Sequence, residues 1–281
     1  MRPDVLAVVG LGAIGGSVAL QARAAGVRCV VGFSPDPGEA AAAAQAGAIT
    51  DIADSPAAAL RGAELAILAT PPRITLQLIG RLAPHLEADT ILSDVGSVKV
   101  PVIDRAIAAG LANRFAGAHP LAGTHGSGFG YARPDMLTGC VVYICATGQT
   151  GDRAAGVVRS FWDETMKASP VPIDAAAHDR QLAWTSHLPQ AIAYSLANAL
   201  AGLGLEPRAF GPGARDTMRL AAGNPDLWLE IFLENRDAVL DALDGAGGSL
   251  ARLRALVAEG HERNLRVYLT QAAEFRRGLE R

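Results

Sequence analysis

Residues 5–16 read V-L-A-V-V-G-L-G-A-I-G-G and decide the fold of the N-terminal part of this chain. Residues 6–9 form a short apolar run of strand length. The pattern Gly10-x-Gly12-x-x-Gly15 follows, and residues 17–25 then form an Ala- and Leu-rich segment that favours a helix. A strand, a glycine turn and a helix in this order are the context in which the pattern is typical of a dinucleotide-binding site.

The three glycines have distinct predicted roles in such a site. Gly10 permits the tight turn, Gly12 lets the backbone approach a pyrophosphate, and Gly15 lets the helix pack closely on the strand. The pyrophosphate would bind backbone N–H groups at the start of the helix, where we expect Ala13 and Ile14 to contribute. The alternative is a glycine-rich turn that binds nothing.

The composition is that of a globular protein with a large core. The 281 residues suffice for two domains or one large one, and half of them are hydrophobic while 19% are charged. The net charge of −3 comes without a basic run, so we expect no nucleic-acid partner. No uncharged apolar stretch reaches membrane-spanning length and no secretory signal precedes the first strand, so we expect a cytoplasmic protein with no membrane partner.

The three cysteines, Cys29, Cys140 and Cys145, lack CxxC spacing and lie in apolar runs. This placement favours small buried thiols over a redox or metal site. No other metal-ligand spacing is present in the sequence, so we expect no metal cofactor.

Strands alternate with helices up to about Asp174, which predicts an α/β domain with an open, mostly parallel, doubly wound (Rossmann) sheet. The predicted strands are residues 6–9, 27–33, 65–70, 90–95, 115–119, 139–146 and 170–173. The helices expected between the early strands are residues 39–46, a helix that begins at residues 54–56 with a cap residue followed by proline, and residues 75–86.

After Asp174 the sequence shows no strand pattern, and we expect an all-α C-terminal domain. The predicted helices are residues 175–203 (broken only at 188–189), 214–222, 227–243 and 250–277, the last two separated by residues 245–248. The predicted domains are therefore residues 1–173 and 174–281.

The choice between NAD and NADP stays open in the sequence. A ribose-binding acid is expected near the end of the strand at residues 27–33, but Ser34 follows that strand and Asp36 comes two places late. A carboxylate would bind the ribose hydroxyls and repel a 2′-phosphate, whereas Ser34 would tolerate the phosphate, although no Arg stands beside it. Ser34, Thr70 and Pro71, at the ends of two strands, complete the predicted cofactor contacts.

Two polar clusters, residues 94–99 and 117–128, follow strands of the predicted sheet, where ligands bind in this architecture. His119 is well placed as a general base near neutral pH, and its alternative is a loop or core histidine bonded to backbone. Ser97 is the second candidate, with the alternative that it is only a helix N-cap.

Six short motifs are spread in order along nearly the whole chain: G-L-G-A-I-G-G-S at 10–17, D-V-G-S-V-K at 94–99, H-P-L-A-G-T at 119–124, S-H-L-P at 186–189, R-D-T-M-R at 215–219 and N-P-D-L-W…I-F-L-E-N at 224–235. Together they resemble the prephenate/arogenate dehydrogenase family of tyrosine biosynthesis. So many short matches are very improbable by chance.

The resemblance implies oxidative decarboxylation with NAD or NADP and no metal. Family members transfer the C4 hydride of prephenate to nicotinamide while a histidine takes the hydroxyl proton, and loss of CO₂ aromatises the ring. By motif that histidine is His119, with Ser97 hydrogen-bonded to it or to the substrate hydroxyl. The product would be 4-hydroxyphenylpyruvate, or tyrosine if arogenate is the substrate. His178 is assigned a structural role.

The resemblance also implies substrate-binding residues. Arg219 and Arg215 match positions that hold carboxylates, a task that suits the bidentate guanidinium, although Arg215 could instead be a solvated Arg paired with an acid. His187 matches a substrate-side histidine, and Thr124 lies in the third motif. His125 stands where several family members carry an acid, and because a histidine would not attract the ammonium group of arogenate, it favours prephenate.

The family also implies a homodimer formed through the helical domain. Because the last predicted helix ends close to Arg281, we expect neither an ACT nor a chorismate mutase domain. One rival is another dehydrogenase of this architecture, such as a β-hydroxyacid dehydrogenase or an imine reductase. Such enzymes usually use a lysine or an acid of the helical domain, whereas Lys99 and Lys167 both precede it. The rival of a different class is a non-catalytic dinucleotide-binding sensor.

Overall fold

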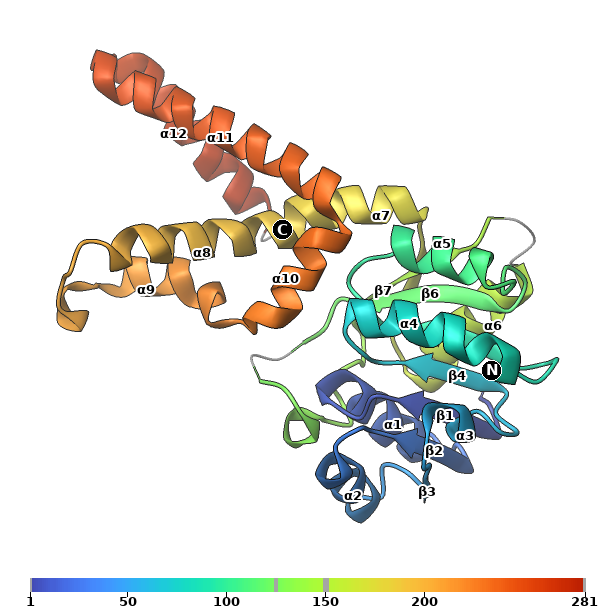
Figure 1. Cartoon of the computed structure of the whole chain (residues 1–281). Helices are drawn as coiled ribbons and strands as arrows, with labels where there is room; N and C mark the ends of the chain where they lie inside the picture. The colour runs from blue at the N-terminus through green and yellow to red at the C-terminus, as the bar shows by residue number, and fades with distance from the viewer. Residues whose placement is uncertain (1, 124–125, 149–151, 280–281) are drawn as a thin grey trace. The chain divides into compact units, whose positions relative to one another are not determined.

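The computed structural model describes residues 2–123, 126–148 and 152–279, which divide into two compact units, Met1–Asn235 and Arg236–Arg281 (Figure 1). The first unit contains the sheet and the second is a pair of helices. No helix in the described part of the chain is long and apolar enough to cross a bilayer.

The described residues of the first unit form one eight-stranded sheet in the order β3-β2-β1-β4-β5-β6-β7-β8. All neighbouring strands are parallel except β6 and β7, which confirms the predicted mostly parallel, doubly wound architecture. The short β3 is the one strand the sequence pattern did not predict. The strands are β1 (Val5–Val9), β2 (Cys29–Phe33), β3 (Asp51–Ile52), β4 (Leu65–Leu68), β5 (Ile91–Asp94), β6 (Phe115–Pro120), β7 (Val141–Ala146) and β8 (Ser169–Pro172).

Helices cover both faces of the sheet, and the central strands are buried on both sides (Figure 1). In β1, Leu6 and Val8 belong to one hydrophobic cluster while Ala7 and Val9 belong to the other. This double burial explains why β1 reads as a continuous apolar run rather than an alternating one. The flanking helices are α1 (Ala13–Ala24), α2 (Pro37–Gln45), α3 (Pro56–Ala59), α4 (Pro72–Leu82), α5 (Val100–Ala108) and α6 (Asp152–Ser160).

Four further helices follow β8 within the same compact unit. They are α7 (Ala175–Leu182), α8 (Leu188–Ala201), α9 (Pro212–Met218) and α10 (Pro225–Glu234). Between α7 and α8 the helix widens into a π-helical turn, η4 (Ala183–His187). Pro189 has no N–H for a regular helical bond, so this wider turn lets one helical path continue past it. The domain boundary expected at residues 173/174 stays a prediction.

The second unit is a helical hairpin of α11 (Arg236–Glu259) and α12 (Glu262–Gly278). The predicted helix break at residues 245–248 is wrong, because α11 runs through these glycines. The breaks lie instead at Asn235 and at Gly260, whose φ of +65° suits glycine. A glycine inside a helix costs only up to about 1 kcal/mol relative to alanine, which a 24-residue helix tolerates.

Candidate active site

The turn between β1 and α1 has the geometry expected for a dinucleotide. Gly10 has φ of +96°, and a Cβ there would lie 2.3 Å from the carbonyl oxygen of Ala69. A Cβ on Gly15 would lie 1.9 Å from the carbonyl oxygen of Gly10, so helix and strand approach closely. At Gly12, by contrast, the nearest atom to such a Cβ is the nitrogen of Gly128 at 4.0 Å. Glycine is thus required at two positions, and the third opens onto free space.

The first turn of α1 can accept a pyrophosphate. Gly12 is its N-cap and supplies no side-chain cap, and Ala13 and Ile14 are only half-buried. Their backbone N–H groups lie at the positive end of the helix, where an anion binds. The residues present therefore fit the predicted cofactor.

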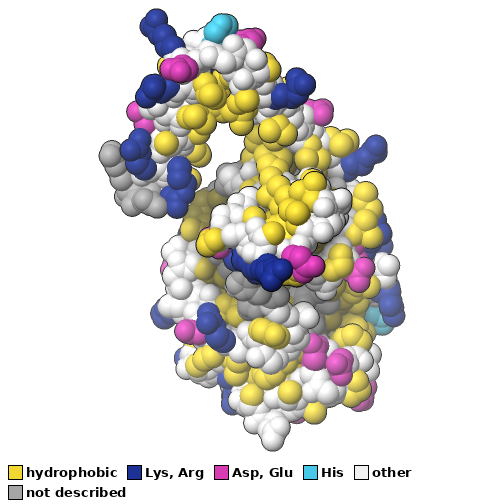
Figure 2. Space-filling model, turned by 90° about the vertical axis from the view of Figure 1, so that its left-hand side faces the viewer, with side chains coloured by type: hydrophobic (Ala, Val, Ile, Leu, Met, Phe, Trp, Pro, Cys, Tyr) yellow, Lys and Arg dark blue, Asp and Glu magenta, His cyan; other side chains and the backbone are white. Residues whose placement is uncertain are grey.

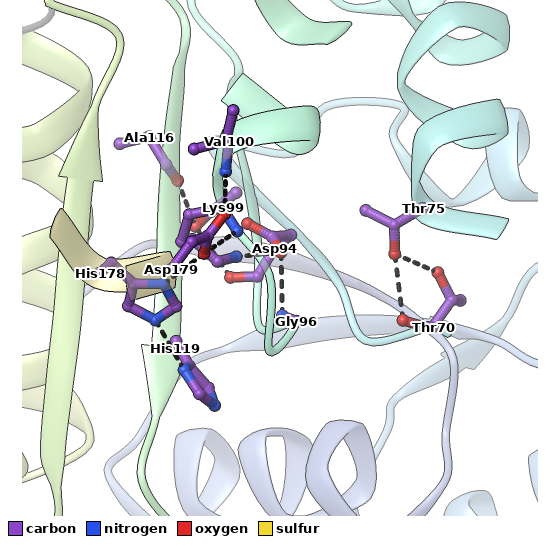
Figure 3. Close-up of polar contacts among 11 residues, drawn as sticks. Thr70, Thr75, Asp94, Gly96, Lys99, Val100, Ala116, His119, His178 and Asp179 are labelled. Carbon is purple, nitrogen blue, oxygen red and sulfur yellow. Dashed lines mark hydrogen bonds and ion pairs between the residues drawn. The ribbon is translucent and has the colours of Figure 1, made fainter. Parts of the chain in front are cut away.

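Thr70 and Pro71 lie where β4 ends, directly beside this turn. The methyl group of Thr70 is 3.1 Å from the Cβ position of Gly10. The Thr70 hydroxyl bonds that of Thr75 at 2.8 Å, and Pro71 is the N-cap of α4 (Figure 3). The structure thus brings both residues to the edge of the sheet that holds the glycine turn.

At the end of β2, neither Ser34 nor Asp36 has a side chain free of other contacts. Ser34 is buried, and its hydroxyl donates to Oε2 of Glu39 at 2.8 Å. Asp36 instead caps α2, accepting the N–H of Gly38 at 2.8 Å. Sequence analysis missed Glu39, because it lies inside a helix rather than at the end of the strand.

His119 lies near the end of β6 and begins a chain of buried polar contacts (Figure 3). Its Nδ1 is 2.9 Å from Nε2 of His178, and Nδ1 of His178 is 2.7 Å from Oδ1 of Asp179. The Asp179 carboxylate also accepts the backbone N–H groups of Lys99 and Val100, each at 2.8 Å. The start of α5, the middle of α7 and the end of β6 therefore meet at this relay of His119, His178 and Asp179.

The hydrogen-bond network assigns the protons of the two rings. Asp179 can only accept, so Nδ1 of His178 is the donor and Nε2 of His178 is the acceptor. Nδ1 of His119 then donates, which leaves Nε2 of His119 with a free lone pair. Burial, followed by the nearby His178 and Lys99, holds the pKa of His119 well below 6.5, so the ring is neutral at neutral pH.

A buried ion pair lies under the loop between β5 and α5. Lys99 Nζ is 2.5 Å from Oδ2 of Asp94, and both side chains are fully buried. Oδ2 also accepts the N–H of Gly96 at 2.9 Å, which ties the loop to the pair. Burial raises the pKa of Asp94, and the Lys99 ammonium opposes that shift. The pair braces the loop that carries Ser97.

Ser97 itself is half-buried in this loop. The alternative that it caps the following helix is wrong, since α5 begins at Val100 with Lys99 as its N-cap residue. Within the described residues no hydrogen bond joins Ser97 to His119. Its catalytic role stays a prediction.

His187 presents a buried donor without a partner. The amide nitrogen of Asn235 lies 3.2 Å from Nδ1 of His187 and also donates to the carbonyl of Asp179 at 2.8 Å. Nδ1 is therefore an acceptor, the proton is on Nε2, and Nε2 has no partner in the described part of the chain. Burial lowers the pKa of His187 to about 4. A buried N–H of this kind is suited to an acceptor oxygen of a ligand.

The two predicted carboxylate ligands differ in their surroundings. Arg215 on α9 donates from Nε to the carbonyl of Phe210 at 2.8 Å and from Nη2 to that of Pro207 at 2.9 Å, which holds the preceding loop. Arg219 is exposed at the start of the 3₁₀ turn Arg219–Ala222. Thr124 and His125 lie outside the described residues.

Comparison with known proteins completes this picture. The family model for the nucleotide-binding domain of prephenate dehydrogenase matches residues 18–169, and the model for its dimerization domain matches residues 174–271. The chain belongs to the prephenate dehydrogenase family. It is therefore an NAD(P)-dependent oxidoreductase, and the resemblance seen in the six motifs is confirmed.

Two relatives of the prephenate dehydrogenase family are similar over most of their length. A prephenate dehydrogenase of Bacillus subtilis is 33% identical over 285 residues, covering 98% of this chain and 76% of the relative. A cyclohexadienyl dehydrogenase of Zymomonas mobilis is 33% identical over 260 residues, covering 90% of this chain and 88% of the relative.

Solved structures of the prephenate dehydrogenase family share the fold. Prephenate dehydrogenase from Aquifex aeolicus, in complex with hydroxyphenyl propionate and NAD⁺, has a TM-score of 0.91 at 29% identity, with 98% of each chain covered. Synechocystis arogenate dehydrogenase has a TM-score of 0.83 at 28% identity, covering 98% of this chain and 99% of the other.

Proposed function

We propose that this chain converts prephenate to 4-hydroxyphenylpyruvate and CO₂, with NAD⁺ or NADP⁺ as hydride acceptor. The observation that carries the proposal is the lone pair on Nε2 of the buried, neutral His119, which is held in that tautomer by His178 and Asp179. Such an imidazole is suited to take a hydroxyl proton as a hydride leaves the same carbon.

The cofactor, when bound, accepts the hydride from C4 of the substrate. His119 Nε2 takes the proton of the C4 hydroxyl, so that C4 becomes a carbonyl carbon. Cleavage of the bond to the ring carboxylate then releases CO₂ and sends its electron pair into the ring, and the C4 oxygen recovers the proton as a phenol. His178 and Asp179 orient the base and stabilise the imidazolium, much as the third residue of a catalytic triad does.

The oxygen atoms of the substrate require hydrogen-bond donors. The proposed donors are a buried imidazole N–H group and the guanidinium group of an arginine. Nε2–H of His187 is buried and without a protein partner in the described residues, so it is a ready donor to a substrate oxygen. Arg219 is proposed to pair with a carboxylate. The remaining proposed contacts are Ser97, Thr124, His125 and Arg215, of which Arg215 would have to exchange its bonds to backbone carbonyls.

We further propose that the chain acts as a homodimer through its C-terminal helices. Large apolar side chains of the α11–α12 hairpin are exposed, among them Leu250 (67% exposed) and Phe275 (71%). Figure 2 shows hydrophobic side chains on the surface of the molecule. The name of the second family model, a dimerization domain, supports this proposal. Sedimentation equilibrium should give the mass of two chains.

The deciding experiment measures reduced nicotinamide formed by the purified protein with prephenate or arogenate, each paired with NAD⁺ or NADP⁺. We expect turnover of prephenate, and a loss of about 10³-fold or more in kcat in His119→Asn, which cannot accept the proton. A kcat/KM at least about tenfold higher for arogenate would reverse the substrate choice. No turnover with any pair would leave a dinucleotide-binding protein without this activity.

A further inference from the structure

The end of β2 bears on which dinucleotide the enzyme selects. In a doubly wound sheet, the residue that follows the second strand meets the adenosine ribose, and a carboxylate there accepts the ribose hydroxyls. In this chain the residue is Ser34, which has no charge. The structure nevertheless brings a carboxylate to the same place, because Glu39 in the first turn of α2 reaches back to Ser34.

The hydroxyl of Ser34 is already engaged on both sides. Its oxygen donates to Oε2 of Glu39 at 2.8 Å and accepts the N–H of Asp36 at 3.2 Å. A hydroxyl has one proton, so Ser34 has none left to donate to a 2′-phosphate. The same bond fixes the Glu39 carboxylate at the end of the strand.

The other oxygen of Glu39 lies beside Gly128, a residue that approaches the dinucleotide turn. Oε1 lies 3.3 Å from the position of a Cβ on Gly128, and the nitrogen of Gly128 lies 4.0 Å from the Cβ position of Gly12. The short 3₁₀ turn η2 (Phe129–Tyr131) packs against both α1 and α2, as Figure 1 shows. Glu39 and the predicted pyrophosphate site therefore lie along one edge of the sheet.

The Glu39 carboxylate has no ion-pair partner among the residues that the structure describes. In the described part of the chain, no Lys, Arg or His nitrogen lies within 4.0 Å of Glu39, which makes its polar contact with Ser34 alone. The carboxylate of Asp36, on the same segment, is engaged in capping α2, where it accepts the N–H of Gly38. A 2′-phosphate in this place would meet like charge, with no cation among the described residues to neutralise it.

We propose that Glu39, held by Ser34, is the specificity-determining residue that accepts the adenosine ribose hydroxyls and makes this enzyme select NAD⁺ over NADP⁺. The inference rests on the proposed function only for the class of ligand, a nicotinamide dinucleotide. It requires no particular second substrate, so it is tested by binding alone.

The test is isothermal titration of the full chain with NAD⁺ and with NADP⁺, without a second substrate. The wild type should bind NAD⁺ at least about tenfold more tightly than NADP⁺. Glu39→Gln should reduce the ratio of the Kd for NADP⁺ to the Kd for NAD⁺ by about tenfold, chiefly because its affinity for NADP⁺ increases. Asp36→Asn is the matched control, since it removes a neighbouring charge and keeps a capping oxygen, and it should leave the ratio within about twofold. Ser34→Ala, which releases the carboxylate, should weaken NAD⁺ binding about threefold or more.

Three results would overturn the role of Glu39. They are tighter binding of NADP⁺ by the wild type, equal binding of both dinucleotides, and equal changes of the ratio in Glu39→Gln and Asp36→Asn. Prephenate turnover is measured in parallel, so the two proposals fail separately. If the protein turns over prephenate but Glu39→Gln leaves the ratio of the two Kd values unchanged, only the role of Glu39 is contradicted. If the protein binds NAD⁺ selectively but turns over no substrate, only the proposed reaction is contradicted.

Discussion

His119 owes its tautomer to a side chain 59 positions later in the chain. Asp179 fixes the tautomer of His178, and His178 in turn fixes that of His119. The carboxylate of Asp179 is itself held by two backbone N–H groups at the start of α5. An imidazole held by such a chain cannot turn its lone pair away from the substrate without breaking buried hydrogen bonds. The relay therefore fixes the geometry of the proposed base.

Substitution of Asp179 should uncouple the base without removing it. In Asp179→Asn the amide can donate to His178, which favours the wrong tautomer of both rings, and we expect kcat to fall about a hundredfold or more while the Kd for the dinucleotide stays within about twofold. Asp174→Asn is the control, because Asp174 caps the same helix by accepting the N–H of Ala177, a contact that Asn retains. Equal losses of kcat in the two variants would contradict the relay.

His187 should make the fold sensitive to acid. Burial lowers its pKa to about 4 from 6.5, so the unfolded chain takes up the proton first as the pH falls. The free energy of unfolding therefore decreases between about pH 6.5 and about pH 4, by up to about 3 kcal/mol from this group.

Urea unfolding at neutral pH and near pH 4.5 checks this prediction. His187→Gln has no titrating ring, and it should lose about 2 kcal/mol less than the wild type on acidification, whatever its stability at neutral pH. If both proteins lose the same free energy, the protonation of His187 does not govern the effect.

At the scale of the elements, α11 shows that glycine alone does not end a helix. Gly247 and Gly248 lie inside it, and a Cβ on either would meet nothing within 4 Å. Gly260 ends the same helix with φ of +65°, a conformation that other residues rarely adopt. What distinguishes the two situations is the backbone conformation that each position requires.

Alanine substitutions should separate these situations. Gly248→Ala should raise the free energy of unfolding by about 0.5–1 kcal/mol, because alanine loses less conformational entropy in a helix. Gly260→Ala should lower it by about 1 kcal/mol, because the left-handed conformation strains a Cβ. Thermal unfolding of both variants measures the difference, and a loss of stability in Gly248→Ala would speak against a continuous α11 in solution.

At the scale of the whole molecule, local patterns predict the sheet and the family but not the contacts between distant segments. Continuous apolar runs followed by glycine or polar residues identify the strands, since burial on both faces leaves a clear mark in sequence. Spacing could not reveal that His178, assigned a structural role, meets His119, or that Asn235 contacts both Asp179 and His187. Such pairings depend on how the elements pack. Glu39 was missed for the same reason, because it reaches the end of β2 from a helix.

The order in which the chain is synthesised gives the relay a further consequence. A ribosome releases the glycine turn and His119 before it releases α7. A nascent chain of that length contains the glycine turn, but Nδ1 of His119 still lacks its partner His178. Asp179 both caps α5 and orients His178. It can connect α5 with His178 only after the strands of the parallel sheet have emerged from the ribosome. Truncated chains that lack α7 would therefore contain the glycine turn but not the partners that align His119.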